Sequence, residues 1–162
     1  MTNLEQQFIE RTKKHIELVN YFASKLGKQY PNHDSSKLTL LLSGYKYFMI
    51  PREQLTAEQT EALDLVTLSH IKNASHHPEY WTNTDLTGFT RSNCCPNGPI
   101  DATQMPQECL CELVCDWCSM SKEFNNSPID WFNSVNGSRW IFTSEQQQFI
   151  LDNLQKAWYG EI

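Results

Sequence analysis

The chain has 162 residues, of which 40% are hydrophobic and 12% aromatic, and its formal net charge is −6 at pH 7. This length and composition fit one folded domain with its own core and exclude a disordered chain. The negative charge argues against binding along a long nucleic acid, which depends on clustered Lys and Arg.

The sequence has no apolar run near the ~18 residues of a membrane-spanning helix, and its N-terminus carries no apolar signal-peptide core. We therefore expect a cytoplasmic protein with no membrane partner. In that compartment the six cysteines are expected as free thiols rather than as a disulfide framework.

The N-terminal half predicts three helices. Residues 3–26 show a helical apolar period, and Gly27 ends the pattern. A second helix is predicted over 35–48. A third is predicted over 56–77, because a Thr-x-x-Gln capping box opens it and Pro78 follows it. The faces expected to point inward are Phe8, Thr12, His15, Val19, Phe22 and Leu26, then Leu38, Leu41, Tyr45 and Phe48, then Leu63, Val66, His70, Ala74 and His77.

The C-terminal half begins with residues 82–104, which are rich in turn formers and lack a period. A loop of this length predicts a lid or a substrate-binding loop. Further helices are predicted over 106–124, 127–135 and 144–159, the last with a Ser144-x-x-Gln147 capping box. With no strand alternation and no repeat, residues 1–162 predict a single all-α domain, a compact bundle of about six helices.

Ionisable side chains lie on, or at the start of, four of these predicted helices. They are His15, His33, Asp34, His70, His76, His77, Glu112 and Asp116. Buried ionisable groups are costly unless they are paired or bind a metal, so one shared site in the middle of the bundle explains them together. Imidazole and carboxylate ligands suit Fe, Mn, Co, Ni or Zn, and we expect one or two such divalent ions.

The order H…HDxxK…H…HH…D resembles the HD-domain superfamily of metal-dependent phosphohydrolases. It is most similar to branches that include the HD-GYP phosphodiesterases and the HD nuclease of CRISPR helicase-nucleases. Over roughly residues 10–125 the chain also resembles a group of small HD-like phage and bacterial proteins with HDxSK, HHPEYW-like and E-x-x-x-D-W motifs. It departs from HD-GYP proteins in lacking the glycine-rich GYP segment, and Arg11 stands where a glutamate would support a third metal.

The resemblance implies two metal positions that share Asp34 as a bridge. It implies that the first metal is held by His15, His33, Asp34 and Asp116, and the second by Asp34, His70, His76 and His77. Such a pair would activate a water for attack on a phosphate ester. Asp34, Lys37 and Glu112 are the predicted catalytic residues, with Glu112 as general base, partner of a histidine or extra ligand.

The function implied is hydrolysis of a small nucleotide-like phosphate ester, by a nucleoside monophosphate phosphatase or a small-nucleotide phosphodiesterase. Lys37, Arg91 and Trp81 are the predicted substrate contacts, and Tyr80 and Trp117 are further candidates for stacking on a base. The alternatives are an HD-type nuclease on single-stranded nucleic acid, a non-catalytic metal- or nucleotide-binding module, and metal-dependent oxygenation.

Simpler interpretations apply to several residues taken singly. Asp34 suits a helix N-cap, His15 a hydrogen-bonded core histidine, and the pair His76 and His77 an exposed helix end. The helical spacing of Cys111, Cys115 and Cys118 predicts a buried stripe, while Cys109 falls on the face of Glu112 and Asp116. The less favoured alternative is a four-thiolate metal site of Cys94, Cys95, Cys115 and Cys118. Phe149, Trp158 and Tyr159 predict core packing or a homodimer face.

Overall fold

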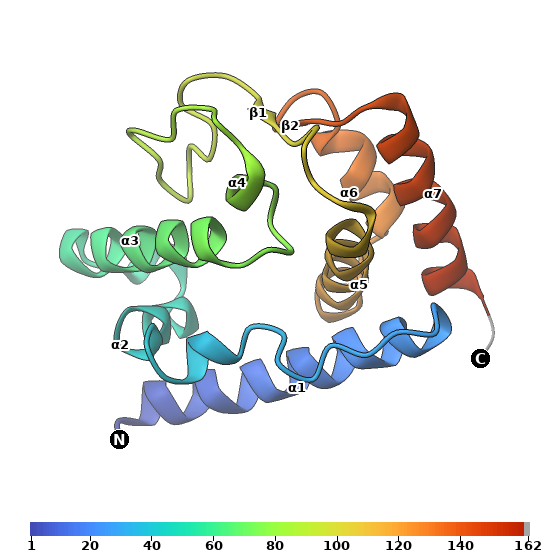
Figure 1. The fold of residues 1–162 in the computed structure, drawn as a ribbon. Helices are drawn as coiled ribbons and strands as arrows, with labels where there is room; N and C mark the ends of the chain where they lie inside the picture. Colours follow the sequence, from blue (N-terminus) through green and yellow to red (C-terminus); the bar gives the residue numbers. More distant parts are fainter. Residues whose placement is uncertain (161–162) are drawn as a thin grey trace.

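The computed structural model describes residues 1–160, so the last two residues of the predicted domain 1–162 lie outside the described part. Over the described residues the fold is all-α, as predicted, with seven α-helices and one two-stranded sheet (Figure 1). In chain order the elements are α1 (Asn3–Lys25), η1 (Ser35–Leu38), α2 (Leu42–Tyr45), η2 (Lys46–Met49), η3 (Arg52–Gln54), α3 (Ala57–Asn73), α4 (Pro78–Trp81), β1 (Ile100–Asp101), α5 (Gln107–Phe124), α6 (Pro128–Val135), β2 (Trp140–Ile141) and α7 (Ser144–Tyr159), where η marks a 3₁₀-helix. No helix of residues 1–160 is long and apolar enough to cross a membrane.

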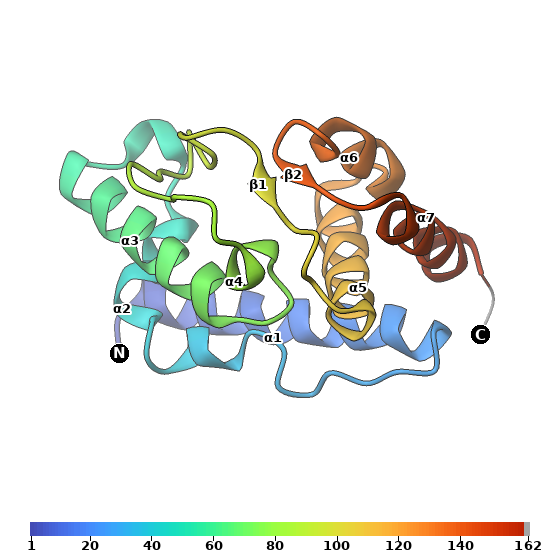
Figure 2. The same cartoon turned by 45° about the horizontal axis from the view of Figure 1, so that its top comes forward.

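Helix α1 has the predicted extent within one residue and carries a capping box of Thr2 and Glu5. Gly27 then turns the chain with φ +69°, a value that favours glycine. The following segment runs back along α1 (Figure 2). Asn20 fixes this return, since its amide accepts from the backbone N–H of Tyr30 at 2.7 Å and donates to the Tyr30 carbonyl at 3.0 Å. This return brings residue 33 beside residue 15.

The single helix predicted over 35–48 is wrong. The chain forms three short pieces there, η1, α2 and η2, because Thr39 leaves helical geometry with φ −128° and ψ −82°. Helix α2 packs so closely on α3 that a Cβ added to Gly44 would lie 2.4 Å from Val66 Cγ1. The tertiary contact between α2 and α3 therefore takes precedence over a continuous helical period.

The third predicted helix is also too long. Its capping box of Thr56 and Gln59 is confirmed, but α3 ends at Asn73. His77 is extended and precedes α4, which begins at Pro78. A residue before proline disfavours helical geometry, which explains why the helix does not reach residue 77. His76 and His77 therefore lie on the turn after α3 rather than on its face.

The loop over 82–104 is held by polar contacts between side chains and backbone. Asp85 accepts from the N–H and the hydroxyl of Thr87, and the Asn97 amide donates to the carbonyls of Asp85 and Thr87. The loop ends in β1, which pairs in parallel with β2. These two short strands were not predicted, because two residues cannot show an alternation.

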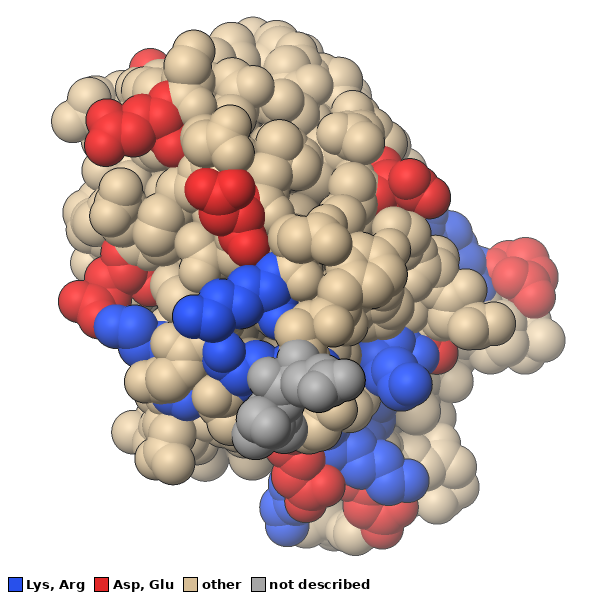
Figure 3. Space-filling model, turned by 90° about the vertical axis from the view of Figure 1, so that its right-hand side faces the viewer, with Lys and Arg blue, Asp and Glu red and all other residues tan. Residues whose placement is uncertain are grey.

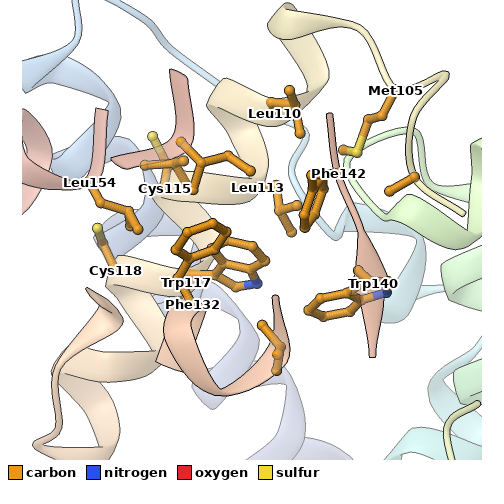
Figure 4. Packing of buried hydrophobic residues seen from close by; sticks show 14 of the residues in the cluster. Met105, Leu110, Leu113, Cys115, Trp117, Cys118, Phe132, Trp140, Phe142 and Leu154 are labelled. Atoms are coloured by element: carbon orange, nitrogen blue, oxygen red, sulfur yellow. The ribbon is translucent and has the colours of Figure 1, made fainter. Parts of the chain in front are cut away.

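The larger core lies in the C-terminal half, where α5 packs on α1, α6 and α7. The stripe of Cys111, Cys115 and Cys118 is buried, as predicted, and Figure 4 shows Cys115 and Cys118 beside Trp117 and Leu154. Phe149 and Trp158 pack against this core, whereas Tyr159 is exposed.

Two helix starts differ in detail from the prediction. Pro106 is the N-cap of α5 rather than its first residue. Helix α7 is capped by Thr143 and Gln146, not by Ser144 and Gln147. Both differences amount to one residue and leave the packing of the helices unchanged.

Candidate metal centre

Asp34 lies at the middle of a buried cluster of histidines. Its Oδ1 lies 3.0 Å from His70 Nε2 and 3.2 Å from His76 Nε2. Its Oδ2 faces the other way, 3.5 Å from His15 Nε2 and 3.6 Å from His33 Nε2. The backbone at Asp34 is left-handed with φ 54°, and its side chain makes no hydrogen bond that caps η1. Asp34 is therefore the N-cap of η1 by position only, and its carboxylate, instead of capping the helix, connects two groups of histidines.

The first group is formed by α1, α5 and the segment before η1. His15 Nε2 lies 3.2 Å from His33 Nε2 and 3.1 Å from Asp116 Oδ1. The other ring nitrogen of His15, Nδ1, contacts the Ser119 hydroxyl at 2.9 Å, which leaves Nε2 facing the cluster. We call His15, His33, Asp34 and Asp116 the carboxylate-rich side.

The second group is formed by the end of α3 and the turn after it. His77 Nε2 lies 3.1 Å from His70 Nε2, and the His76 and His77 rings are 4.3 Å apart. Within Asp34, His70, His76 and His77, one ligand atom from each residue lies within 4.8 Å of the others. We call these four residues the histidine-rich side. The turn places His76 and His77 in this group even though neither belongs to α3.

Three buried atoms of the cluster residues have no hydrogen-bond partner, Asp34 Oδ1, His70 Nδ1 and His76 Nε2. Buried polar atoms are almost always satisfied, and each orphaned one requires an explanation. A metal ion would satisfy Asp34 Oδ1 and His76 Nε2, since carboxylate oxygen and imidazole nitrogen are common ligands of first-row divalent ions. The cluster can therefore hold metal, and its ligand types are those that the sequence predicted.

Glu112 lies behind the ligands, on the face of α5 that it shares with Asp116. Its Oε1 is 2.8 Å from His33 Nδ1 and 3.4 Å from His76 Nδ1. A carboxylate on the far nitrogen of a ligating histidine fixes the ring and its tautomer. Of the three roles predicted for Glu112, the geometry matches that of a partner for histidine.

The charges in the cluster shift the proton affinities of its members in opposite directions. Burial opposes the charge on His33, but the neighbouring carboxylates Asp34, Asp116 and Glu112 outweigh it and raise the pKa of His33 to about 10. Burial and the Lys37 ammonium together lower the pKa of His70 to about 4. Burial also opposes the charge on Asp34, yet Lys37 and His33 hold its pKa well below its ordinary value.

A cavity of about 240 Å³ opens beside the cluster. We call it the metal cavity; its lining includes His15, Asp34, His70, His77 and Asp116, together with the cations Arg11, Lys37, Arg91 and Arg139 and the aromatic residues Phe8, Tyr45, Phe48, Trp117, Trp131 and Trp140. Lys37 Nζ donates to Asp34 Oδ2 at 2.8 Å, so the predicted lysine is at the site. The loop over 82–104 brings Arg91 to the cavity wall, where its guanidinium lies 5.3 Å from the Phe48 ring centre.

Trp81 does not line the metal cavity. Its indole N–H donates to the Ser75 carbonyl at 2.9 Å, and its ring packs against the larger core. Tyr80 is exposed, and Trp117 lies in the cavity wall. Of the three predicted substrate contacts, Lys37 and Arg91 therefore line the cavity and Trp81 does not.

Sequence reasoning missed Arg139 and Glu79, which together shape one wall. Arg139 Nη2 lies 3.4 Å from Glu79 Oε1, and the Trp140 indole N–H donates to the same oxygen at 2.9 Å. Glu79 is buried, one residue after Pro78. The sequence offered one hint, a glutamate between Pro78 and the aromatic pair Tyr80 and Trp81, but its partners lie about 60 residues away along the chain.

The four-thiolate alternative is wrong. Within residues 1–160, none of the ligand groups that could hold a metal includes a cysteine. Cys115 and Cys118 are buried in the core, while the thiols of Cys94 and Cys95 lie near the backbone carbonyls of Arg91 and Ser138. The loop cysteines and the helix cysteines therefore do not meet.

Comparison with known proteins yields one family match. The family described as "Family of unknown function (DUF5662)" matches residues 4–157, nearly the whole chain. Neither the curated proteins nor the solved structures contain a match. The chemistry of the site must therefore be argued from the residues themselves.

Proposed function

We propose that this chain, which belongs to the DUF5662 family of unknown function, is a metal-dependent phosphohydrolase acting on a small nucleotide-like phosphate ester. The carrying observation is the placement of Asp34, whose two oxygens face two adjoining groups of histidines. A carboxylate that serves two neighbouring ligand groups is what a pair of divalent ions requires. The resemblance to HD-domain phosphohydrolases supports the same assignment.

The residues around Asp34 would hold the divalent ions, which when bound would lower the pKa of a bound water and act as a Lewis acid for the phosphoryl oxygens. The side chains of the protein position the substrate and the histidine rings, and they neutralise the charge of the phosphate. Lys37 uses one of its three N–H donors on Asp34 and keeps two for phosphate oxygens. Arg91 adds a planar guanidinium suited to two phosphate oxygens at once. Glu112 holds the rings of His33 and His76 in place from behind.

Small substrates are favoured over polymers by the size of the site and by the formal net charge of −6. The metal cavity of about 240 Å³ matches a small ligand better than a strand. On the one face that Figure 3 shows, formed by α7 and the end of α1, most Lys and Arg lie in the middle and lower part, with Asp and Glu mainly above and below them. A nuclease on single-stranded nucleic acid remains the second candidate, and a non-catalytic module the third.

The test is a metal-loaded activity screen with a matched pair of variants. The protein is loaded anaerobically with Mn²⁺ or Fe²⁺ and assayed on nucleoside monophosphates, small phosphodiesters and single-stranded DNA. Asp34→Ala should abolish both metal content and hydrolysis. Asp152→Ala removes an exposed aspartate on α7 and should change neither.

Each alternative has its own outcome in this screen. Hydrolysis of single-stranded DNA alone, with steep salt dependence, would favour the nuclease. Metal binding without hydrolysis of any phosphate ester would favour the non-catalytic module. Turnover that requires dioxygen would point to oxygenation instead.

A further inference from the structure

A second hollow of about 240 Å³ adjoins the metal cavity, and we call it the outer hollow. It lies where α5 ends and α6 begins. Its walls are Trp117, Met120, Ser121, Phe124, Asn126 and Trp131. Three of these residues, Trp117, Met120 and Trp131, also line the metal cavity, so the two hollows are neighbours with a shared wall. None of the six wall residues is charged.

Two large aromatic side chains in this wall are open to solvent. Phe124 is 55% exposed and Trp131 is 39% exposed. Trp131 makes one aromatic contact within residues 1–160, with Trp140 at 6.5 Å and 75°. Exposed aromatic side chains grouped at a hollow mark a binding surface more often than scattered ones do.

Trp117 is not available for stacking, although it belongs to both walls. Trp140 stacks on it at 5.7 Å and 25°, and Phe132 packs at 6.0 Å. Figure 4 shows these rings together in the core. A flat ligand group in the outer hollow would therefore have to use Trp131 and Phe124.

The metal cavity, in contrast, has charged side chains beside its aromatic ones, and its cations are unequally paired. Arg11 makes two hydrogen bonds of 2.8 Å to Glu123, and Lys37 and Arg139 each have a carboxylate partner. Within residues 1–160, the guanidinium of Arg91 has no ion pair, and burial lowers its pKa. The metal cavity thus offers an unpaired cation and candidate metal ligands, and the adjoining outer hollow offers aromatic faces without a charged neighbour in its wall.

From this contrast we infer that the outer hollow binds the nucleobase of the substrate, stacked on Trp131 and Phe124, while the phosphate lies at the metal cavity. This inference rests on the proposed function. A base fits better than an alkyl chain for two reasons. It is flat, and its polar edge can pair with the side-chain amide of Asn126, which lines the hollow. Together the two hollows reach the size of ordinary small-ligand pockets, roughly 300–1,000 Å³.

The experiment compares substrates with and without a base. The parent protein should hydrolyse AMP with a kcat/KM about tenfold above that for ribose 5-phosphate, as expected from one stacked base. Trp131→Ala and Phe124→Ala should each lower the ratio of kcat/KM for AMP to kcat/KM for ribose 5-phosphate towards one. Tyr159→Ala removes an exposed aromatic ring on α7, 61% exposed and outside both hollows, and should preserve it.

A second measurement does not depend on hydrolysis. Saturation-transfer NMR with adenosine, which has no phosphate, should show binding to the parent protein and loss of binding in Trp131→Ala. Because Trp131 and Phe124 are partly exposed, both variants should keep the parent's circular dichroism spectrum.

The outcomes separate this inference from the proposed function. Equal hydrolysis of AMP and ribose 5-phosphate, with no adenosine signal, would overturn the base site and keep the hydrolase. Octyl phosphate hydrolysed as well as AMP, with both weakened in Trp131→Ala, would replace the base by an alkyl chain. Adenosine binding that depends on Trp131, without hydrolysis of any ester, would keep the base site and overturn the hydrolase.

Discussion

The two sides of Asp34 hold histidines whose pKa values shift in opposite directions. On the carboxylate-rich side, the acidic neighbours outweigh burial and raise the pKa of His15, and they raise that of His33 to about 10. On the histidine-rich side, burial and the Lys37 ammonium bring the pKa of His70 to about 4, and burial beside the imidazoles of His76 and His70 lowers the pKa of His77. His15 and His70 reach the same carboxylate, at 3.5 Å and 3.0 Å.

The difference teaches that the neighbouring charge, carboxylates around His33 and the Lys37 ammonium beside His70, decides which of these two histidines carries a proton. A histidine must be neutral to bind a metal. At neutral pH His70 is therefore already in its metal-binding form. His33 holds a proton that a metal must displace, but the carboxylates around it also attract the metal cation.

The largest expected effect comes from removing the residue that both sides share. Asp34→Ala should weaken metal binding by at least about 100-fold on both sides, more than the loss of an outer partner causes. His70→Ala should affect mainly the histidine-rich side and leave metal on the other. Elemental analysis of the three proteins after gel filtration measures this. If His70→Ala empties the protein as fully as Asp34→Ala, the two sides do not act as separate ligand groups.

The next effect concerns Glu112, which lies behind both sides but closer to His33. Glu112→Gln should weaken metal binding by about 10- to 100-fold, because the His33 ring loses the carboxylate that orients it. Glu108→Gln, on the exposed part of α5, is the matched control and should leave affinity unchanged. Competition with a chromophoric chelator gives both affinities. An unchanged affinity in Glu112→Gln would mean that the ligands hold their positions without it.

The two sides should also differ in how their metal affinity depends on pH. Between pH 6 and pH 9, affinity on the carboxylate-rich side should rise about tenfold per pH unit for each proton displaced. The histidine-rich side should change less, because His70 with a pKa of about 4 is already neutral. Calorimetric titrations in buffers of different ionisation enthalpy measure the protons released. Equal proton release for the first and second metal equivalents would contradict the predicted difference between the two sides.

The smallest effect concerns the stability of the metal-free protein. The pKa of His33 rises on folding from 6.5 to about 10, so its stabilisation is fully present below pH 6.5 and is lost as the pH rises through about 10. The pKa of His70 falls on folding to about 4, so the fold loses stability as the pH drops from 6.5 towards 4. Asp34 and Asp116, whose pKa values are lowered, add a further loss as the pH falls through their folded values.

Melting curves of chelator-treated protein from pH 4 to pH 10 should therefore show a maximum near neutral or slightly acidic pH. His33→Gln should flatten the alkaline limb and leave the acidic limb in place. If the alkaline limb is unchanged in this variant, groups other than His33 cause the loss of stability at alkaline pH.

The fold could be predicted from the sequence where a helix buries one regular face. Helices α1, α5, α6 and α7 begin and end within about one residue of their predicted limits, because their apolar period and turn residues are local features. The prediction failed over 35–48 and at 74–77. Over 35–48 the chain follows the close packing of α2 on α3. At 74–77 it leaves helical geometry, and His76 and His77 lie in the cluster around Asp34.

The sequence by itself indicated the candidate ligand residues, since ionisable side chains at apolar positions need a common partner wherever the helices place them. Only the tertiary structure decided which oxygen of Asp34 faces which histidine, how the return segment brings His33 to His15, and that Arg139 and Trp131 share a cavity with Arg91. The physical reason is the separation along the chain over which each interaction acts. Helical period and capping act over a few residues, whereas charge, proton occupancy and cavity shape depend on contacts between segments far apart in the chain.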